Sequence, residues 1–483
     1  MKDGSSRLPI EENSEHGSMR CLWPCLLLLI FPACQPRQPG GERPTTLIPL
    51  AGEWTQGEEH LPLEPPLADP TLDAWFEMSL KKNPSFLQKV EAVEILRQQE
   101  AIAKANRLPL LSWGLDASRR QSHQGIPGSD FRSSSHGVDL ALSWEADLWG
   151  RLDHLRSAAR SDRLISEIDR EAMKISLRRQ LSLRWVALVE VREGVVLIEK
   201  QLKTLEQLKG IYRLDLELDT SSSDRFLRAQ RRYQDLRIRK EDLLSLGKEE
   251  HIMIRELLGG QETLEQDFEK KLLPDLGGVG DSSMVRILSR PDVLGAAQRL
   301  RAQLSRQKAA DLSWWPQFKL SLSGGSSSLQ IKNLLDPEKL VWVLASSITQ
   351  QLFQGDRKKA EKSLEESRVK AALQACVEVV QSALSEVELS LEKESGHSKA
   401  LKLLSSQETD LRGIEKQWQD RFQSGDGGVA QVIEARLDRY SLEERQLRRR
   451  ADRLRNRLDL FFSLGGGFEG VEGIQPPRLE EGE

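Results

Sequence analysis

The stretch VDLALSWEADLWGRLDHLRSAARS, Val138–Ser161, decides the fold. In its first half every second residue from Val138 to Trp144 is apolar, which is the period of a strand with one apolar and one solvated face. After Gly150 the apolar residues recur at three- and four-residue steps among Arg, Asp and Ser, which is the period of an amphipathic helix. The stretch therefore predicts a strand that runs directly into a helix.

The same change of period occurs again about two hundred residues later. VWVLASSITQQLF, Val341–Phe353, is followed by a charged helical pattern, and Gly355 with Arg357 stands where the first copy has Gly150 with Arg151. We interpret this as an internal duplication. Its unit is a helix, a strand pair, a long helix and a second helix, and these Gly-Arg sites are the expected strand-to-helix junctions.

The composition favours long helices over compact cores. Of 483 residues, 30% are charged and only 5% are aromatic. The net charge of -4 gives no argument for nucleic acid, because Arg alternates with Glu and Asp along the predicted helices. Cys376 stands alone in a helical segment and the His residues are scattered, so we expect no disulfide, metal site or cofactor, and we find no catalytic constellation.

The N-terminal region predicts export. A basic residue followed by the short apolar run CLWPCLLLLIFPAC is typical of a signal peptide, which we assign to residues 1–33 with translation starting at Met19. Because the run ends at Cys34 in a lipobox-like sequence, we expect a covalent lipid on that cysteine, with an ordinary cleaved signal as the alternative. Residues 34–70 are rich in Pro, Gly and Glu and predict an extended tether.

The remaining chain divides at Pro and Gly breaks. Glycines within 425–428 turn the second long helix back on itself. The expected segments are N-terminal helices (71–108), a first β-hairpin (109–148), a first long helical hairpin (149–260), a linker (261–281), a helix opening the second repeat (282–313), a second β-hairpin (314–353), a second long helical hairpin (354–464) and a disordered tail (465–483).

Two strand pairs with an apolar face and open edges do not form a stable sheet alone. Association with copies of the same chain would close the sheet, and a shared transmembrane barrel is the result if the strands enter lipid. Six tryptophans in or beside the strands fit a membrane-interface girdle, although core positions in a soluble sheet would also explain them. They are Trp113, Trp144, Trp149, Trp314, Trp315 and Trp342.

At this point the sequence resembles the TolC-like outer-membrane efflux proteins, in particular the lipoprotein branch that forms the exit duct of multidrug efflux pumps. The resemblance spans about Leu72 to Glu469 and is specific because many motifs occur in the right order. They are SWEADLWGRLDHLRSAARS (Ser143–Ser161), RPDVLGAAQRLRA (Arg290–Ala302), QQLFQGDRKKAE (Gln350–Glu361), RFQSGDGGVAQVIEAR (Arg421–Arg436) and LGGGFE (Leu464–Glu469).

The resemblance implies a mainly α-helical fold with a small β part. It implies a homotrimer in the outer membrane of a diderm bacterium, in which each protomer gives four strands to a twelve-stranded β-barrel and its helical hairpins to a periplasmic tunnel. It also implies a passive, non-enzymatic duct whose partners are a periplasmic adaptor protein, an inner-membrane pump and outer-membrane lipid.

The resemblance further implies a periplasmic gate at the tip of the helical hairpins. The family's acidic motif maps onto residues 430–435, where Glu434 takes an acidic position and Gln431 stands where some members carry Asp. The glycines of the tip turn are Gly425, Gly427 and Gly428. On the residues alone, a carboxylate on a solvated helical face is the better explanation of Glu434.

The sequence leaves two other functions open. The same architecture serves type I protein secretion or metal export, and the sequence does not separate these cargoes from toxic small molecules. A periplasmic coiled-coil lipoprotein without a pore is the alternative of a different class. The duplicated strand pairs argue against it, because such a protein has no need of lipid-facing hairpins.

Overall fold

The computed structural model describes residues 65–122, 131–218, 223–260, 272–274, 276, 284–330, 336–472 and 474. The predicted signal peptide, the proposed start at Met19, Cys34 and most of the 34–70 tether lie outside these residues. So does most of the 261–281 linker.

The first repeat runs from helix to strand pair to helical hairpin, as the duplication predicts. Its described elements are α1 (Pro70–Lys82), α2 (Pro84–Ala105), β1 (Leu110–Ser122), β2 (Phe131–Ala146), α3 (Arg151–Leu218) and α4 (Ser223–Leu257). The break between the first two helices follows from local chemistry, because Pro84 occupies the first turn of α2 and the Asn83 side chain accepts a hydrogen bond from the Phe86 amide. The strand β2 starts seven residues before the predicted Val138, in a Ser-rich segment whose polarity hides the alternation.

The second repeat has the same order. Its described elements are η4 (Met284–Ser289), α5 (Pro291–Leu312), β3 (Gln317–Ser328), η6 (Pro337–Lys339), β4 (Val341–Thr349), α6 (Arg357–Gln423) and α7 (Val429–Ser463). The helices α3 and α6 have 68 and 67 residues, which at ~1.5 Å per residue makes each about 100 Å long. The expected mainly α-helical fold class with four strands is confirmed.

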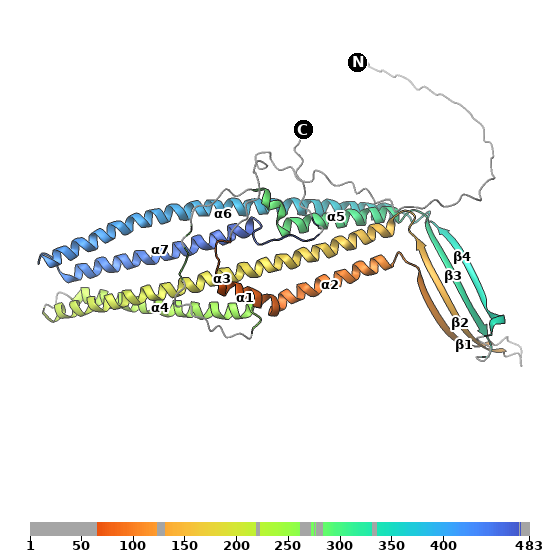
Figure 1. The fold of residues 1–483 in the computed structure, drawn as a ribbon, viewed down its shortest axis with the longest axis horizontal. Coiled ribbons are helices and arrows are strands. Elements are labelled where there is room, and N and C mark those ends of the chain that lie inside the picture. Colours follow the sequence, from red (N-terminus) through yellow and green to blue (C-terminus); the bar gives the residue numbers. More distant parts are fainter. Residues whose placement is uncertain are drawn as a thin grey trace, which may run out of the picture. The chain divides into compact units, whose positions relative to one another are not determined.

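The two strand pairs join into one antiparallel sheet of order β1-β2-β3-β4 at one end of the helices (Figure 1). The repeats meet at the β2–β3 pair, where Trp144 is opposite Leu320 and Leu142 is opposite Leu322. Consequently β1 and β4 are the edges of the sheet within this chain.

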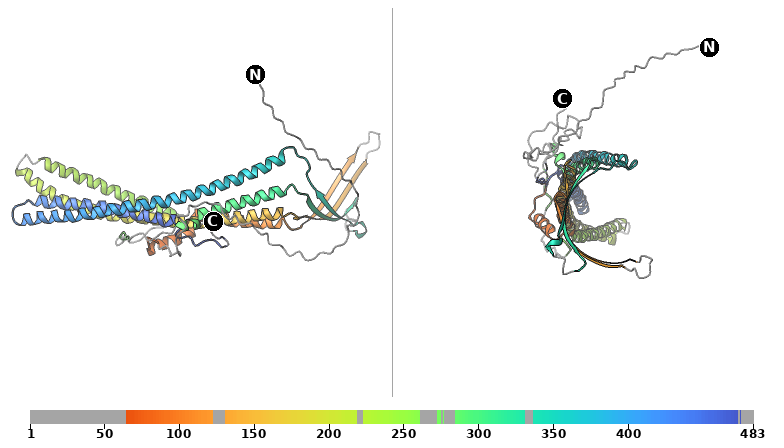
Figure 2. Two further views of the ribbon diagram at one scale, coloured as in Figure 1. Left: turned by 90° about the horizontal axis from the view of Figure 1, so that it is seen from above. Right: turned by 90° about the vertical axis from the view of Figure 1, so that its right-hand side faces the viewer.

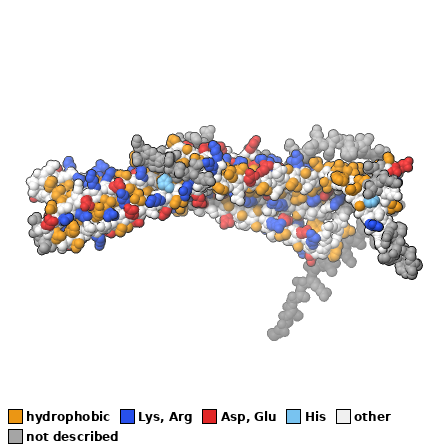
Figure 3. All heavy atoms as spheres, turned by 90° about the horizontal axis from the view of Figure 1, so that it is seen from below, with side chains coloured by type: hydrophobic (Ala, Val, Ile, Leu, Met, Phe, Trp, Pro, Cys, Tyr) orange, Lys and Arg blue, Asp and Glu red, His pale blue; other side chains and the backbone are white. Residues whose placement is uncertain are grey.

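The helices form two tiers that share α3 and α6. Next to the sheet, α2 packs on α3, α3 on α5, and α5 on α6; farther away, α4 packs on α3, α3 on α7, and α7 on α6. The views of Figure 2 show α4 and α6 on the outer sides of this arrangement. Basic and acidic side chains are interspersed along the helices in Figure 3, and no described helix is both long and apolar enough to cross a membrane.

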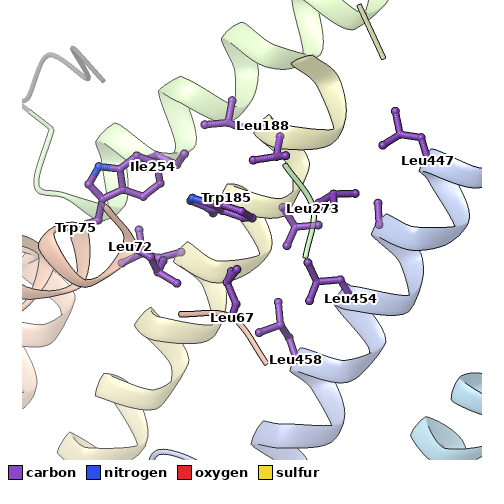
Figure 4. Close-up of a cluster of buried hydrophobic side chains, with 14 of the residues drawn as sticks. Leu67, Leu72, Trp75, Trp185, Leu188, Ile254, Leu273, Leu447, Leu454 and Leu458 are labelled. Atoms are coloured by element: carbon purple, nitrogen blue, oxygen red, sulfur yellow. The ribbon is translucent and has the colours of Figure 1, made fainter. Parts of the chain in front are cut away.

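The main core lies where the two tiers meet (Figure 4). Trp75 of α1 and Trp185 of α3 are almost fully buried there, together with Leu454 of α7. Two members correct the sequence prediction: Leu67, from the predicted tether, and Leu273, from the predicted polar linker, are both buried in this cluster. Single apolar residues inside polar segments carry no periodicity, which is why the pattern missed them.

The chain also stays ordered in turns beyond the predicted start of the disordered tail at 465. The amide of Gly465 donates to the Phe462 carbonyl, and that of Gly466 to the Phe461 carbonyl. A Cβ on Gly466 would lie 2.6 Å from the Phe461 carbonyl oxygen, so the close approach requires glycine. Most residues of the predicted tail after 472 lie outside the described residues.

Candidate functional site: the hairpin tip, the junctions and the sheet

The tip of the second helical hairpin is a tight glycine turn between α6 and α7. Gly425 has φ +82°, and the amide of Asp426 donates to the Arg421 carbonyl, which closes the end of α6. A Cβ on Gly427 would lie 3.2 Å from the Arg421 Cβ. Gly428 is the N-cap of α7, and a Cβ there would lie 2.6 Å from the Gln431 side-chain oxygen. The three predicted turn glycines and Gln431 are therefore neighbours, with Gln431 folded back over the turn.

Glu434 lies on α7 one turn beyond Gln431 and is exposed. Its Oε1 accepts a hydrogen bond of 2.5 Å from the hydroxyl of Tyr212, on α3. Burial of the Tyr212 ring, and then this hydrogen bond, raise the pKa of Tyr212 above its usual range, so the phenol stays protonated and donates. Sequence reasoning missed Tyr212, because nothing in the local pattern shows that it lies opposite Glu434.

Hydrophobic contacts fix this pair in place. Tyr212 belongs to a buried cluster with Leu205 and Leu208 of α3 and Ile433 and Leu437 of α7. Ile433 directly precedes Glu434, so burial of the former orients α7 and places the latter at the edge of the cluster. The hydrogen bond therefore joins the first helical hairpin to the second near their tips.

Sequence reasoning also missed an ionic cluster near the tip, between α6 and α7. Glu415 of α6 is 9% exposed and accepts hydrogen bonds from Arg436 Nε (2.9 Å) and Arg439 Nε (2.8 Å), both on α7. Burial works against the charge, but the two guanidinium groups outweigh it and hold the pKa of Glu415 below its usual value. This cluster locks the two helices of the second hairpin together.

The two strand-to-helix junctions differ in detail. Gly150 has φ +82° and Gly355 has φ +60°, so both take a conformation that favours glycine. Arg151 pairs back to Glu145 of β2 at 2.7 Å, whereas Arg357 pairs forward to Glu361 of its own helix at 2.7 Å.

The first junction has a further element that the sequence prediction did not include. The Asp147 carboxylate accepts hydrogen bonds from the amides of Leu152 and Asp153, and so satisfies the free donors at the start of α3. The corresponding helix α6 begins at Arg357, and the side chain of its N-cap residue, Asp356, makes no such capping hydrogen bond.

The sheet has one apolar and one polar face. On the first, Leu111, Trp113 and Leu115 of β1 pair with Leu142, Leu140 and Val138 of β2, and the row continues across β3 to Trp342 and Leu344 of β4. The opposite face is polar at its centre, where Ser143, Ser321 and Ser323 lie in neighbouring rows with Ser112 of β1. It also carries apolar residues on the edge strands, namely Leu110 of β1 and Val341 and Val343 of β4. Most of these apolar side chains are exposed in the single chain; Trp113 is 75% and Trp342 69% exposed.

Close cross-strand approaches shape the polar face. A Cβ on Gly114 would lie 2.5 Å from Asp139 Oδ1, and one on Gly137 would lie 2.2 Å from Asp116 Oδ1. Each carboxylate thus lies across a glycine of the paired strand.

The six predicted interface tryptophans have two kinds of environment. Trp113 and Trp342 lie on the open apolar face, in one row of the sheet. The other four lie at the junctions with the helices. Trp144 Nε1 donates to the Arg107 carbonyl (3.0 Å), and Trp149 Nε1 donates to the Pro316 carbonyl (2.7 Å). The Trp149 ring lies 4.9 Å from the Trp315 ring, and Lys358 lies over the Trp314 ring. The structure therefore separates rings on the open face of the sheet from rings that contact residues at the junctions with the helices.

No group of three or more potential metal ligands occurs among the described side chains. The geometry is that of a scaffold with a sheet amphipathic across its two faces at one end and cross-linked hairpin tips at the other.

Comparison with known proteins identifies this scaffold. The family model described as outer membrane efflux protein matches residues 75–260 and 286–466. Outer membrane protein OprJ of Pseudomonas aeruginosa is 26% identical over 471 residues, which cover 92% of this chain and 95% of OprJ. The pyoverdine export outer membrane protein OpmQ of Pseudomonas putida is 23% identical and covers 83% of this chain and 87% of its own.

A solved structure of an outer membrane channel has the same fold. The open state of the Neisseria gonorrhoeae MtrE outer membrane channel superposes with a TM-score of 0.75 at 26% identity, over 83% of this chain and 90% of that one. The family model covers both repeats, including their strand pairs and helical hairpins. The chain therefore belongs to the outer membrane efflux protein family.

Proposed function

We propose that three copies of this outer membrane efflux channel close their sheets into one twelve-stranded barrel. The observation that carries the proposal is the sheet itself, which has an apolar face, a polar face and two edges, β1 and β4, without a partner among the described strands. Joining β1 of one copy to β4 of the next would satisfy the edge amides and carbonyls and turn the apolar face toward lipid. Trp113 and Trp342 would then lie on the lipid-facing surface.

The helices of the same trimer would form a periplasmic tunnel. The outer helices expose apolar side chains, among them Ile95 and Ile102 of α2, Leu227 and Ile238 of α4, and Leu389 and Leu403 of α6. Since α2 and α4 lie on one side of the chain and α6 on the other, neighbouring copies would bury both sets.

The tunnel would act as a passive exit duct. It would receive small toxic compounds from a periplasmic adaptor and an inner-membrane pump and release them outside the cell. A relative named for pyoverdine export supports a small-molecule cargo. Deletion of the gene should raise the intracellular level of a fluorescent pump substrate. Wild-type protein supplied in trans should return that level to its original, lower value. Unchanged accumulation across a panel of such compounds would count against this cargo class.

Trimer formation is tested separately by membrane fractionation and cross-linking of the full chain. We expect a species of three copies in the outer membrane fraction. A monomer, or a species confined to the soluble periplasm, would contradict the barrel.

Glu434 and Gln431 would form the periplasmic gate. In a trimer, three Glu434 carboxylates around a narrow axis would favour cations and repel one another. The hydrogen bond from Tyr212 supports this assignment, because it fixes the carboxylate between the two hairpins. Glu434→Gln should reduce the cation preference of single channels in planar bilayers; unchanged selectivity and opening would exclude the gate.

Cys34 would carry the covalent lipid that anchors the mature chain. The support is the lipobox-like sequence alone. Metabolic labelling with palmitate should mark the wild-type protein and leave Cys34→Ser unlabelled.

A further inference from the structure

A polar cleft lies between α4 and α7, over α3, apart from the turn and the gate residues. Its volume is about 460 Å³. The residues that line it come from all three helices: Gln201, Arg232, Leu236, Arg239, Ser441, Glu444, Arg445 and Arg448.

The α3 side of the cleft is formed by a buried amide. Gln201 is 2% exposed, and its side-chain Nε2 has no hydrogen-bond partner among the described residues. A buried N–H donor without a partner costs free energy comparable to a lost hydrogen bond, so such groups normally meet a ligand or an ordered water. We therefore expect the Gln201 Nε2 donor to meet a hydrogen-bond acceptor inside the cleft.

The charges of the cleft are unbalanced. Four arginines and a single glutamate line it, which gives 4 - 1 = +3. Glu444 is already shared by Arg239 (2.5 Å) and Arg448 (3.4 Å), and it joins α4 to α7 through the former. Among the described residues, Arg232 on α4 and Arg445 on α7 pair with no carboxylate.

We propose that this cleft binds a small free oxyanion bearing a phosphate or carboxylate group. Arg232 and Arg445 would supply its counter-charges from opposite sides, and Gln201 Nε2 would donate the neutral hydrogen bond. Guanidinium groups suit this role because their planar donor fork matches the oxygens of such anions. The volume accommodates an ion of this size with hydration water, and the Arg239–Glu444 pair spans the cleft beside it.

The bound anion would connect the two helical hairpins of one protomer. Arg232 belongs to the first hairpin and Arg445 to the second, so an anion between them adds a bridge that neither helix makes alone. Because it would bind only while α3, α4 and α7 are packed, it would stabilise that packing in proportion to its occupancy. The inference does not depend on the gate assignment.

The test uses the full-length protein purified in detergent, with inorganic phosphate as the probe at constant ionic strength. Phosphate should raise the thermal midpoint of the wild type and bind in equilibrium dialysis, whereas chloride should not. The variant Arg232→Gln/Arg445→Gln should bind phosphate about tenfold more weakly than the wild type, because hydrogen bonds to charged groups are lost. Gln201→Leu should weaken binding by a smaller factor.

The matched control is Arg237→Gln/Arg449→Gln, which removes the same two charges from the same two helices at exposed positions outside the cleft. It should bind phosphate like the wild type. If both double variants lost phosphate binding equally, the cause would be the overall charge of the protein, and the proposed site would be wrong. Undiminished binding in Arg232→Gln/Arg445→Gln, with cooperative unfolding retained, would overturn it as well, as would binding of an acidic peptide but not of phosphate.

Discussion

The hydroxyl of Tyr212 donates a hydrogen bond to Glu434 across 222 residues of sequence, and so joins α3 of the first repeat to α7 of the second. The contact is polar at its end and apolar along its length, because the Tyr212 ring is buried while the carboxylate it holds is exposed. A contact of this kind opposes separation of the two hairpins while the Glu434 carboxylate stays accessible to solvent.

Replacing Tyr212 with Phe should loosen the tip while preserving the buried ring. A hydrogen bond to a charged group contributes about 1.5 to 3 kcal/mol when buried, and exposure of Glu434 reduces this to about 1 kcal/mol. We expect channels of Tyr212→Phe to open more often in planar bilayers than those of the wild type, with the same oligomeric state by cross-linking.

The control for this change is Tyr233→Phe. Tyr233 packs against the same cluster and lies under Lys209, but it makes no hydrogen bond to Glu434. Equal channel activity of the two variants would show that the Glu434 contact does not restrain the tip.

Adjacent positions on β2 separate the two faces of the sheet. Leu140→Arg would place a charge on the apolar face, at a cost of about 2 to 4 kcal/mol if that face meets the middle of a bilayer. Ala141→Arg would place the same side chain on the polar face. We expect the first to reduce the yield of trimer in the outer membrane severely and the second to leave it largely unchanged, as measured by fractionation. Similar yields would argue against a lipid-facing apolar surface.

Acid should weaken the second hairpin through Glu415. Because its pKa is lowered in the folded chain relative to the usual 4.5, the ionised group contributes stability above that pH and loses it as the pH falls further. Glu415→Gln should therefore lower stability by about 1 to 3 kcal/mol at pH 7, and the gap to the wild type should narrow below about pH 4.5.

Thermal unfolding of both proteins between pH 7 and pH 3 measures this gap. The exposed Glu388 on the same helix gives the control Glu388→Gln. A gap that stays constant with pH would assign the effect to packing rather than to charge.

The junction tryptophans should differ in stability effect from those on the open face. Trp149→Phe removes the hydrogen bond to Pro316 and alters the contact with Trp315, so it should cost about 1 kcal/mol and lower the thermal midpoint. Trp113→Phe keeps an exposed aromatic ring and should have little effect. A larger loss for the second would reverse our assignment of the two environments.

The sequence predicted those features that depend on local chemistry. Alternation from Val138 to Trp144 and the change of period at Gly150 are properties of neighbouring residues, and their recurrence at Gly355 predicted the second copy. The predicted fold class was confirmed for that reason. Strand β2 was predicted too short because its serine-rich start lacks the apolar alternation on which the prediction depends.

Contacts between distant parts of the chain could not be predicted in this way. Tyr212 is an ordinary residue of an amphipathic helix until α7 is placed beside it, and Glu415 has no special spacing from Arg436 until the hairpin closes. Leu67 and Leu273 stand in polar segments, and only the packed structure shows that both enter the central core. The gate, the lipid on Cys34 and the trimer remain predictions.

The position of the central core also has a mechanical consequence. Leu188 and Leu454 hold α3 and α7 together there, and α3 continues for 30 residues beyond Leu188 to its end at Leu218. At ~1.5 Å per residue that arm is about 45 Å long, so a rotation of only about 5° at the core would displace the far end by about 4 Å. A small rotation of the helices near Trp185 would thus become a displacement of several ångströms at the end of α3, just beyond the Tyr212–Glu434 contact.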